Sequence, residues 1–303
     1  MNDAPDSPRS SSEISSHLVD VQSQEPAIPL RIDRVGIRGL TMPILVRQRD
    51  HAEPQRTVAS ISLGVDLPAK ANGTHMSRFV ETLQGLACSS EDAGAALDYA
   101  VALRLMRETV DRLHADYAYI AFTFPYFLIR KAPVSGIRSL MSYQCTLSGE
   151  IDRTREENSA FSPFTLAVTV PVMTVCPCSK AISDEGAHSQ RADIRIAVRM
   201  KANVWIEDLV ELAEAGGSSP VYSLLKRADE KYVTEHAFAQ PCFVEDVARR
   251  VAASLGAHPQ ISAFSVDVES YESIHAHNAF ATIQDCDGAP DSHPRHTRPL
   301  LPL

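Results

Sequence analysis

The sequence predicts an α+β protein made of two units in tandem, each an antiparallel sheet with helices packed on one face. Three extended segments, 134–151, 164–174 and 192–205, follow one another with no helix between them. Strands connected in this way pair antiparallel, because parallel pairing needs a long crossover connection. The 303 residues are enough for one large domain or two ordinary ones.

The first unit contains two strands, a long helix and a third strand before the extended run. The segment 34–40 is typical of a short strand, and 57–67 alternates apolar and polar residues as a half-buried strand does. The segment 94–115 is rich in alanine and has apolar residues at helical spacing, so it predicts the longest helix. The β-branched and aromatic segment 117–124 predicts a strand, and 152–160 is a polar connection.

The second unit returns to helices after the extended run. The segment 206–215 ends at two glycines, which is a helix stop signal. A Ser-Pro pair opens 219–229 and is typical of an N-cap followed by the first helical residue. The segment 244–255 predicts a third helix, and alternation over 261–270 predicts a final strand.

Composition and charge exclude several classes of protein. The formal net charge of −9 argues against broad nucleic-acid binding, which needs a basic face. No apolar run approaches the ~18 residues of a membrane span, and the N-terminus lacks the pattern of a signal peptide. We therefore expect a cytoplasmic protein whose six cysteines serve metal binding or catalysis rather than a disulfide framework. The polar, proline-containing segments 1–30 and 285–303 are predicted to be tails.

The most informative motif is Cys176-Pro-Cys178, followed by a histidine at 188. Thiolate and imidazole ligands together suit zinc or a similar metal ion. Lys180 and Arg191 lie in the same window, where cations favour the thiolate and meet anionic substrates. The two sulfurs need not share one metal, so one thiol is free to face a substrate. The alternative is a pair of inert thiols beside an ordinary packed or surface His188.

A second group of chemical side chains, Glu272, His275 and His277, lies just past the last predicted strand. Histidine serves as acid or base and glutamate as base or metal ligand, although a polar loop has the same composition. Glu245 and Asp246 open a predicted helix, where acidic residues commonly just complement the helix dipole.

The segment 73–79, Gly-Thr-His-Met-Ser-Arg-Phe, is suited to capping a helix or holding a phosphate. The sequence has no P-loop and no Gly-x-Gly-x-x-Gly after a strand, so neither standard nucleotide site is supported.

Several motifs, taken in order, resemble those of the prokaryotic type IB GTP cyclohydrolase I family. The resemblance runs from about residue 34 to residue 281 and leaves out only the tails. The motifs are Leu-Pro-Ala at 67–69, the segment 73–79, Cys-Pro-Cys-Ser-Lys at 176–180, Gly-Ala-His-Ser-Gln-Arg at 186–191, Phe-Val-Glu-Asp at 243–246 and Glu-Ser-Ile-His-Ala-His at 272–277.

The resemblance implies the tunnelling fold, with two modules, 31–160 and 161–284, fused in one chain. It also implies a homotetramer with active sites at subunit interfaces. The implied reaction is hydrolysis of GTP to 7,8-dihydroneopterin triphosphate and formate, the first step of folate synthesis. The implied cofactor is a divalent metal ion, for which zinc, manganese and iron(II) are all candidates.

Roles follow from the resemblance residue by residue. Cys176 is similar to the family's metal-binding thiolate, with His188 and Glu230 as co-ligands. Cys178 is similar to a second thiol that faces the substrate. Glu245 is similar to the carboxylate that anchors the guanine base.

The resemblance also places Glu272 and His275 at the same site, either at the metal or at water. The triphosphate needs cations, for which Lys180, Arg191 and Arg78 are the candidates. Two other readings stay open. One is a related enzyme such as a deazaguanine nitrile reductase that uses Cys178 as a covalent nucleophile. The other is a non-catalytic metal-binding assembly protein.

Overall fold

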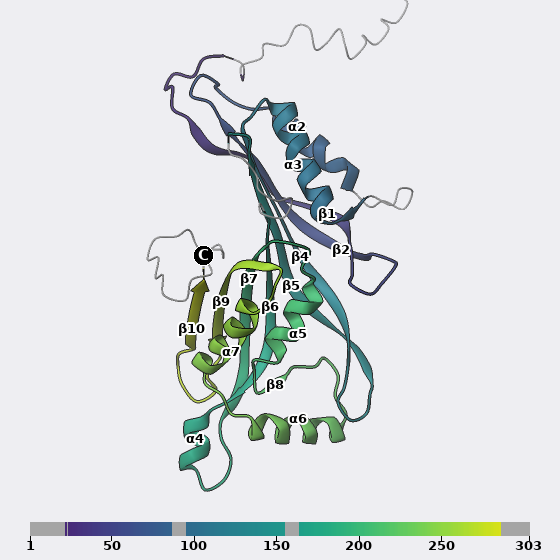
Figure 1. The fold of residues 1–303 in the computed structure, drawn as a ribbon, viewed down its shortest axis with the longest axis vertical. Coiled ribbons are helices and arrows are strands. Elements are labelled where there is room, and N and C mark those ends of the chain that lie inside the picture. Colours follow the sequence, from purple (N-terminus) through teal and green to yellow (C-terminus); the bar gives the residue numbers. More distant parts are fainter. Residues whose placement is uncertain (1–21, 23, 87–94, 155–163, 286–303) are drawn as a thin grey trace, which may run out of the picture.

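The computed structural model describes residues 22, 24–86, 95–154 and 164–285, and within them ten strands form one sheet (Figure 1). The sheet order is β10-β9-β7-β6-β5-β4-β2-β1-β3, with β8 paired to β6. Neighbouring strands are antiparallel except for the short parallel pair of β1 and β3. The strands are β1 Ile32–Val46, β2 Gln55–Leu67, β3 Ala96–Leu97, β4 Tyr117–Lys131, β5 Arg138–Asp152, β6 Phe164–Val175, β7 Ser189–Met200, β8 Ser219–Pro220, β9 Ile261–Ser270 and β10 Ala279–Asp285.

Helices pack on the apolar face of this sheet, as the strand alternation predicts. Along β6 the buried Leu166, Val168 and Val170 alternate with partly exposed small residues, so one face joins the core. The α+β class is therefore confirmed. The helices are α2 Met76–Leu83, the short 3-10 turn η1 Gln84–Leu86, α3 Tyr99–Leu113, α4 Pro177–Ile182, α5 Ile206–Glu214, α6 Arg227–Ala239 and α7 Val244–Gly256. No helix in the described ranges is long and apolar enough to cross a membrane.

The two predicted units share one continuous sheet, because β5 pairs with β6 over Gln144–Gly149. The proposed boundary between residues 160 and 161 lies outside the described residues. So do most of the predicted tails and most of the polar connection 152–160.

Helix α5 of the second half is fastened to strands of the first half by two buried tyrosines. Tyr126 and Tyr143 are directly opposite each other on β4 and β5. Their hydroxyls donate to Glu207 at 2.6 Å and to Glu214 at 3.0 Å. The two glutamates are seven residues apart on α5 and so share one helix face. This contact couples the two halves of the chain.

The predicted helix 219–229 is wrong. Ser219 and Pro220 form β8 against Met173 and Val172 of β6, and the helix begins only at Arg227. The N-terminus is set by Asp229, whose carboxylate accepts from the Lys226 amide at 2.9 Å. The Ser-Pro pair is therefore an extended segment, and the N-cap, Lys226, lies seven residues further along the chain than the predicted Ser219.

Asp229 also anchors α6 to the turn between β4 and β5. Its buried carboxylate accepts hydrogen bonds from the amides of Val134 and Ser135 and from the Ser135 hydroxyl. Burial alone would raise the pKa of Asp229, but these bonds and the Lys226 amide outweigh it and hold the pKa well below its usual range. The carboxylate therefore stabilises the fold above the pH at which an unfolded aspartate titrates, and this stabilisation is lost as pH falls.

We expect Asp229→Asn to lower the melting temperature at pH 7, because a neutral amide accepts fewer and weaker hydrogen bonds than a carboxylate. The difference from the parent chain should shrink as the pH falls below about 4. Scanning calorimetry at pH 7 and in acid measures both effects, with the exposed Asp184→Asn as the control. A variant as stable as the parent at pH 7 would show that Asp229 does not anchor α6.

Candidate functional site

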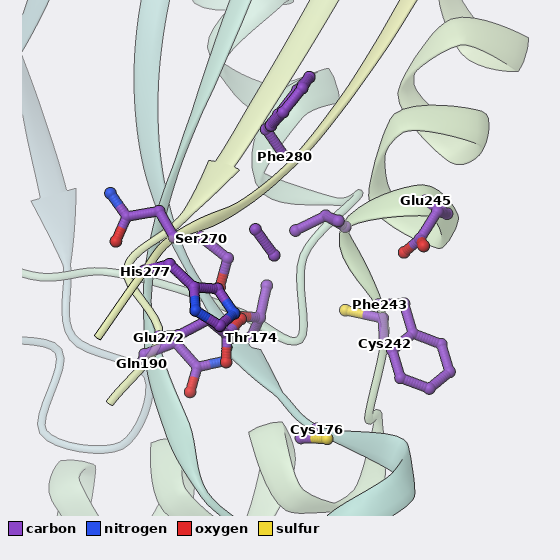
Figure 2. Close-up of a pocket in the computed structure, with 13 residues that line it drawn as sticks. Thr174, Cys176, Gln190, Cys242, Phe243, Glu245, Ser270, Glu272, His277 and Phe280 are labelled. Carbon is purple, nitrogen blue, oxygen red and sulfur yellow. Dashed lines mark hydrogen bonds between the residues drawn. The ribbon is translucent and has the colours of Figure 1, made fainter. Parts of the chain in front are cut away.

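A cavity of about 440 Å³ lies where β6, β7, β9 and the start of α7 meet (Figure 2). The polar floor of this cavity consists of Thr174, Gln190 and Ser270. The strand register brings them together, because Thr174 on β6 is opposite Gln190 on β7 and Ser270 is the last residue of the neighbouring strand β9. Phe243, just before α7, and Phe280 on β10 add apolar walls. A cavity of this size, with a few polar groups among apolar ones, is typical of a small-molecule site.

Three potential metal ligands gather beside this floor: His188, Glu272 and His275. One ligand atom from each lies within 4.8 Å of the others. The side chains of His188 and Glu272 are only 11% and 13% exposed, with Nδ1 of His188 3.7 Å from a carboxylate oxygen of Glu272. Imidazole nitrogen and carboxylate oxygen are donors that zinc, iron(II) and manganese accept, so the group fits a divalent ion.

A loop folds back on α4 and brings His188 next to Cys176. Gly186 has a φ of 82°, a backbone conformation that favours glycine, and the chain reverses there. The His188 amide then donates to the Ser179 hydroxyl at 3.1 Å, and its carbonyl accepts from the Cys176 amide at 3.1 Å. These backbone bonds fix the predicted pair side by side.

Cys176 is the N-cap of α4, with its sulfur accepting from the Ser179 amide at 3.4 Å. The side chain lines the cavity (Figure 2), although its sulfur is not part of the group of three ligands. Cys178 lies two residues further on α4 and is exposed, and the peptide bond before Pro177 is trans. The two thiols therefore have different surroundings, as the sequence motif predicts.

Of the other predicted site residues, Glu245 and His277 line the cavity and Glu230 does not. Glu245 lies in the first turn of α7 and lines the cavity on the side away from Glu272 (Figure 2). Glu230, in the first turn of α6, has an exposed side chain and is outside the group of three ligands. His277 lines the cavity, with its ring stacked 5.2 Å from that of His275.

The three predicted phosphate contacts are not among the described residues that line the cavity. Lys180 extends to α6, where Nζ donates to the Phe238 carbonyl and lies 4.2 Å from the centre of its ring. Arg191 is exposed on β7. Arg78 lies on α2, in the part of the molecule remote from α4 and α7 (Figure 1), and donates to the Arg112 carbonyl.

Sequence reasoning assigned no role to several residues of the cavity, including Thr174, Gln190, Ser270 and Cys242. Thr174, Gln190 and Ser270 lie at or next to strand ends, where functional groups are common. This position is the sequence feature from which their place in the cavity could have been predicted. Cys242 is buried, with its sulfur 3.1 Å from the Ser218 hydroxyl. Burial raises the pKa of the Cys242 thiol, so it is a neutral group at pH 7.

The family model that matches this chain and two of its curated relatives carry the same description. The family model described as type I GTP cyclohydrolase folE2 matches residues 18–281. GTP cyclohydrolase FolE2 of Desulfovibrio desulfuricans is 58% identical over 267 residues, which cover 88% of this chain and 97% of that protein. The protein of the same name from Nitratidesulfovibrio vulgaris is 56% identical over 267 residues, covering 88% and 96%. A solved mutant urate oxidase of Bacillus sp. TB-90 shares the fold alone, with a TM-score of 0.50 at 9% identity over 84% of this chain and 99% of that chain.

Proposed function

Because the chain belongs to the type I GTP cyclohydrolase FolE2 family, it is a GTP cyclohydrolase, and we propose that a divalent metal ion bound at His188 supports the reaction. GTP and water give 7,8-dihydroneopterin triphosphate and formate, the hydrolytic step that begins folate biosynthesis. The observation that carries the metal proposal is the gathering of His188, Glu272 and His275 beside a cavity that Cys176 and Glu245 also line.

His188 is the residue shared by the two possible ligand sets. The family resemblance implies Cys176, His188 and Glu230, whereas the described geometry groups His188 with Glu272 and His275. We propose His188 as a ligand in either case. A bound divalent ion supplies Lewis acidity and lowers the pKa of water into the neutral range. Zinc, manganese and iron(II) all accept such mixed nitrogen, oxygen and sulfur donors.

The remaining side chains bind the base and move protons. Glu245 accepts hydrogen bonds from the N1–H and amino group of guanine, which selects that base over purines without both donors. With the ion held by the ligand set that the family resemblance implies, Glu272 is free to accept a proton from the attacking water, and His275 is free to donate one to the imidazole-ring nitrogen as the ring opens. Cys178 is exposed at the start of α4 and is not among the described residues that line the cavity, so the family resemblance alone supports a substrate-facing role for it.

We further propose a cytoplasmic homotetramer with active sites between subunits. The described residues that line the cavity include two glutamates and no lysine or arginine. A triphosphate needs cationic partners, so Arg78, Arg191 and Lys180 are proposed contacts, with some of them supplied by another copy of the chain. We also propose that 31–160 and 161–284 are the two modules of a tunnelling fold, which the single sheet with helices on one face supports.

The test is a parallel assay of metal-free protein with GTP and zinc, manganese, iron(II) or no metal. Formate and the fluorescence of oxidised neopterin measure the reaction. We expect both products only with added metal, and the rates rank the three ions. Full turnover by protein shown to be free of metal would overturn the metal dependence. Intact GTP in every sample, from folded and metal-loaded protein, would overturn the function itself.

A further inference from the structure

Gln190 is at the centre of the hydrogen bonds beneath the cavity. Its carboxamide oxygen lies 2.9 Å from Nδ1 of His188 and 3.4 Å from the Ser273 hydroxyl. Its amide nitrogen lies 3.2 Å from the Thr174 hydroxyl and 3.5 Å from a carboxylate oxygen of Glu272. A single side chain therefore contacts two of the three potential metal ligands. Figure 2 shows the carboxamide of Gln190 beside Glu272.

The orientation of this carboxamide follows from its partners. The carboxylate of Glu272 only accepts hydrogen bonds, so the amide N–H group must face it. The carboxamide oxygen then faces Nδ1 of His188. With the amide reversed, its N–H group would still find an acceptor in an unprotonated Nδ1, but the carboxamide oxygen would meet the Glu272 carboxylate and the hydrogen bond to Glu272 would be lost.

This orientation determines which nitrogen of His188 carries hydrogen. A carboxamide oxygen cannot donate, so the 2.9 Å contact requires hydrogen on Nδ1. Glu272 lies 3.7 Å from the same nitrogen and favours the same tautomer. A neutral imidazole with hydrogen on Nδ1 has its lone pair on Nε2, and that atom is then the one available to a metal ion.

We infer that Gln190 is a positioning residue that holds His188 as the Nδ1–H tautomer, leaving Nε2 for the metal, and holds Glu272 beside it. The inference rests on the proposed metal site. Metal-binding histidines commonly donate their other ring N–H to an oxygen acceptor, and loss of such a partner costs about 10- to 100-fold in metal affinity. The fixed register of β6 and β7 keeps Gln190 in place, because Thr174 is its direct cross-strand neighbour.

Two substitutions separate the two halves of this role. Gln190→Met keeps the size of the side chain and removes both donor and acceptor. Gln190→Glu keeps the acceptor for Nδ1–H and loses the donor to Glu272. The matched control is Gln55→Met, because Gln55 is also partly buried and makes two hydrogen bonds, both to the backbone of Phe127 in β4.

Metal affinity is measured by competition with a chromogenic chelator, using zinc and cobalt(II). We expect Gln190→Met to bind metal about 10- to 100-fold more weakly. Gln190→Glu should lose less affinity than Gln190→Met, because it keeps the acceptor for Nδ1–H although it places a second carboxylate beside Glu272, and Gln55→Met should be unchanged. Unchanged affinity in Gln190→Met would overturn the inference, as would an equal loss in Gln55→Met, which would indicate a general effect on folding.

The tautomer is measured on metal-free protein by solid-state NMR with ¹⁵N-labelled histidine, and His188→Gln assigns the resonance. We expect hydrogen on Nδ1 in the parent chain and in Gln190→Glu, and loss of that preference in Gln190→Met. Hydrogen on Nε2 in the parent would overturn the inference whatever the enzyme does with GTP. Weak metal binding by Gln190→Met, together with a parent chain that leaves GTP intact, would support the inference while refuting the proposed function.

Discussion

Cys176→Ser is expected to abolish formate release from GTP, with turnover falling by roughly three orders of magnitude or more, because the ligand set that the family resemblance implies would lose its thiolate, and the proposed metal ion with it. A serine hydroxyl does not ionise near neutral pH and replaces a soft thiolate donor with a poor one. The substitution should leave the local structure intact. Cys176 is the N-cap of α4, and serine is among the best N-cap residues.

Cys178→Ser is the matched comparison, since it changes an exposed thiol in the same short helix. We expect this variant to keep its metal and lose turnover, whereas Cys176→Ser should lose both. Metal content by atomic emission, formate release and circular dichroism distinguish these outcomes. If Cys176→Ser unfolds the chain, the thiol has a structural role. If it keeps full metal and activity, Cys176 is not a ligand.

Local patterns in the sequence predict most of the fold. The strands 57–67 and 261–270 match β2 and β9 closely, because alternating burial along a half-buried strand is recorded directly in the residue types. The helix expected over 94–115 becomes α3, which starts after Asp98, whose side chain accepts from the Val101 amide. The N-cap at Asp98 sets the start of this helix, which the spacing of apolar residues alone does not define.

The errors arose where distant residues decide the structure. The Ser-Pro pair at 219–220 has a good local helix signal, but pairing with β6 holds it extended. Strand β10, over Ala279–Asp285, was not predicted as a strand, and it exists because it pairs along β9 at the edge of the sheet. Pairing between distant segments is a property of the whole sheet and outweighs weak local preferences.

The site shows the same division. The Cys-Pro-Cys motif and the histidine at 188 are close in sequence, and their proximity in the fold was predicted. Glu272 is 84 residues from His188, and they meet because Ala192 of β7 is opposite Ser270 of β9. The role of Gln190 depends on the direction of one carboxamide, which no sequence pattern records. To predict the metal ligands, one must therefore know the pairing register of β7 and β9. If a partner subunit contributes a ligand, one must also know how the subunits assemble.

Glu245→Gln is expected to lower kcat/KM for GTP by about 100-fold, equivalent to about 2.7 kcal/mol of transition-state stabilisation. In the proposed complex the carboxylate accepts from both guanine donors, whereas glutamine has one accepting oxygen and turns an N–H group toward one of them. A hydrogen bond to a charged group contributes about 1.5–3 kcal/mol, so the predicted loss corresponds to about one such bond. Glu235→Gln, an exposed change on α6 near Lys231, is the control.

Inosine triphosphate tests whether Glu245 reads the base, because it lacks the amino group of guanine. The parent chain should strongly prefer GTP, since an unmet carboxylate in the complex is costly. In Glu245→Gln that preference should narrow, because GTP loses more than the analogue does. Steady-state kinetics on both nucleotides measure the two ratios. An equal fall for both would mean that Glu245 acts on the helix or the chemistry and not on the base. In that case the first-turn position on α7, where a carboxylate favours the helix dipole, would explain the residue.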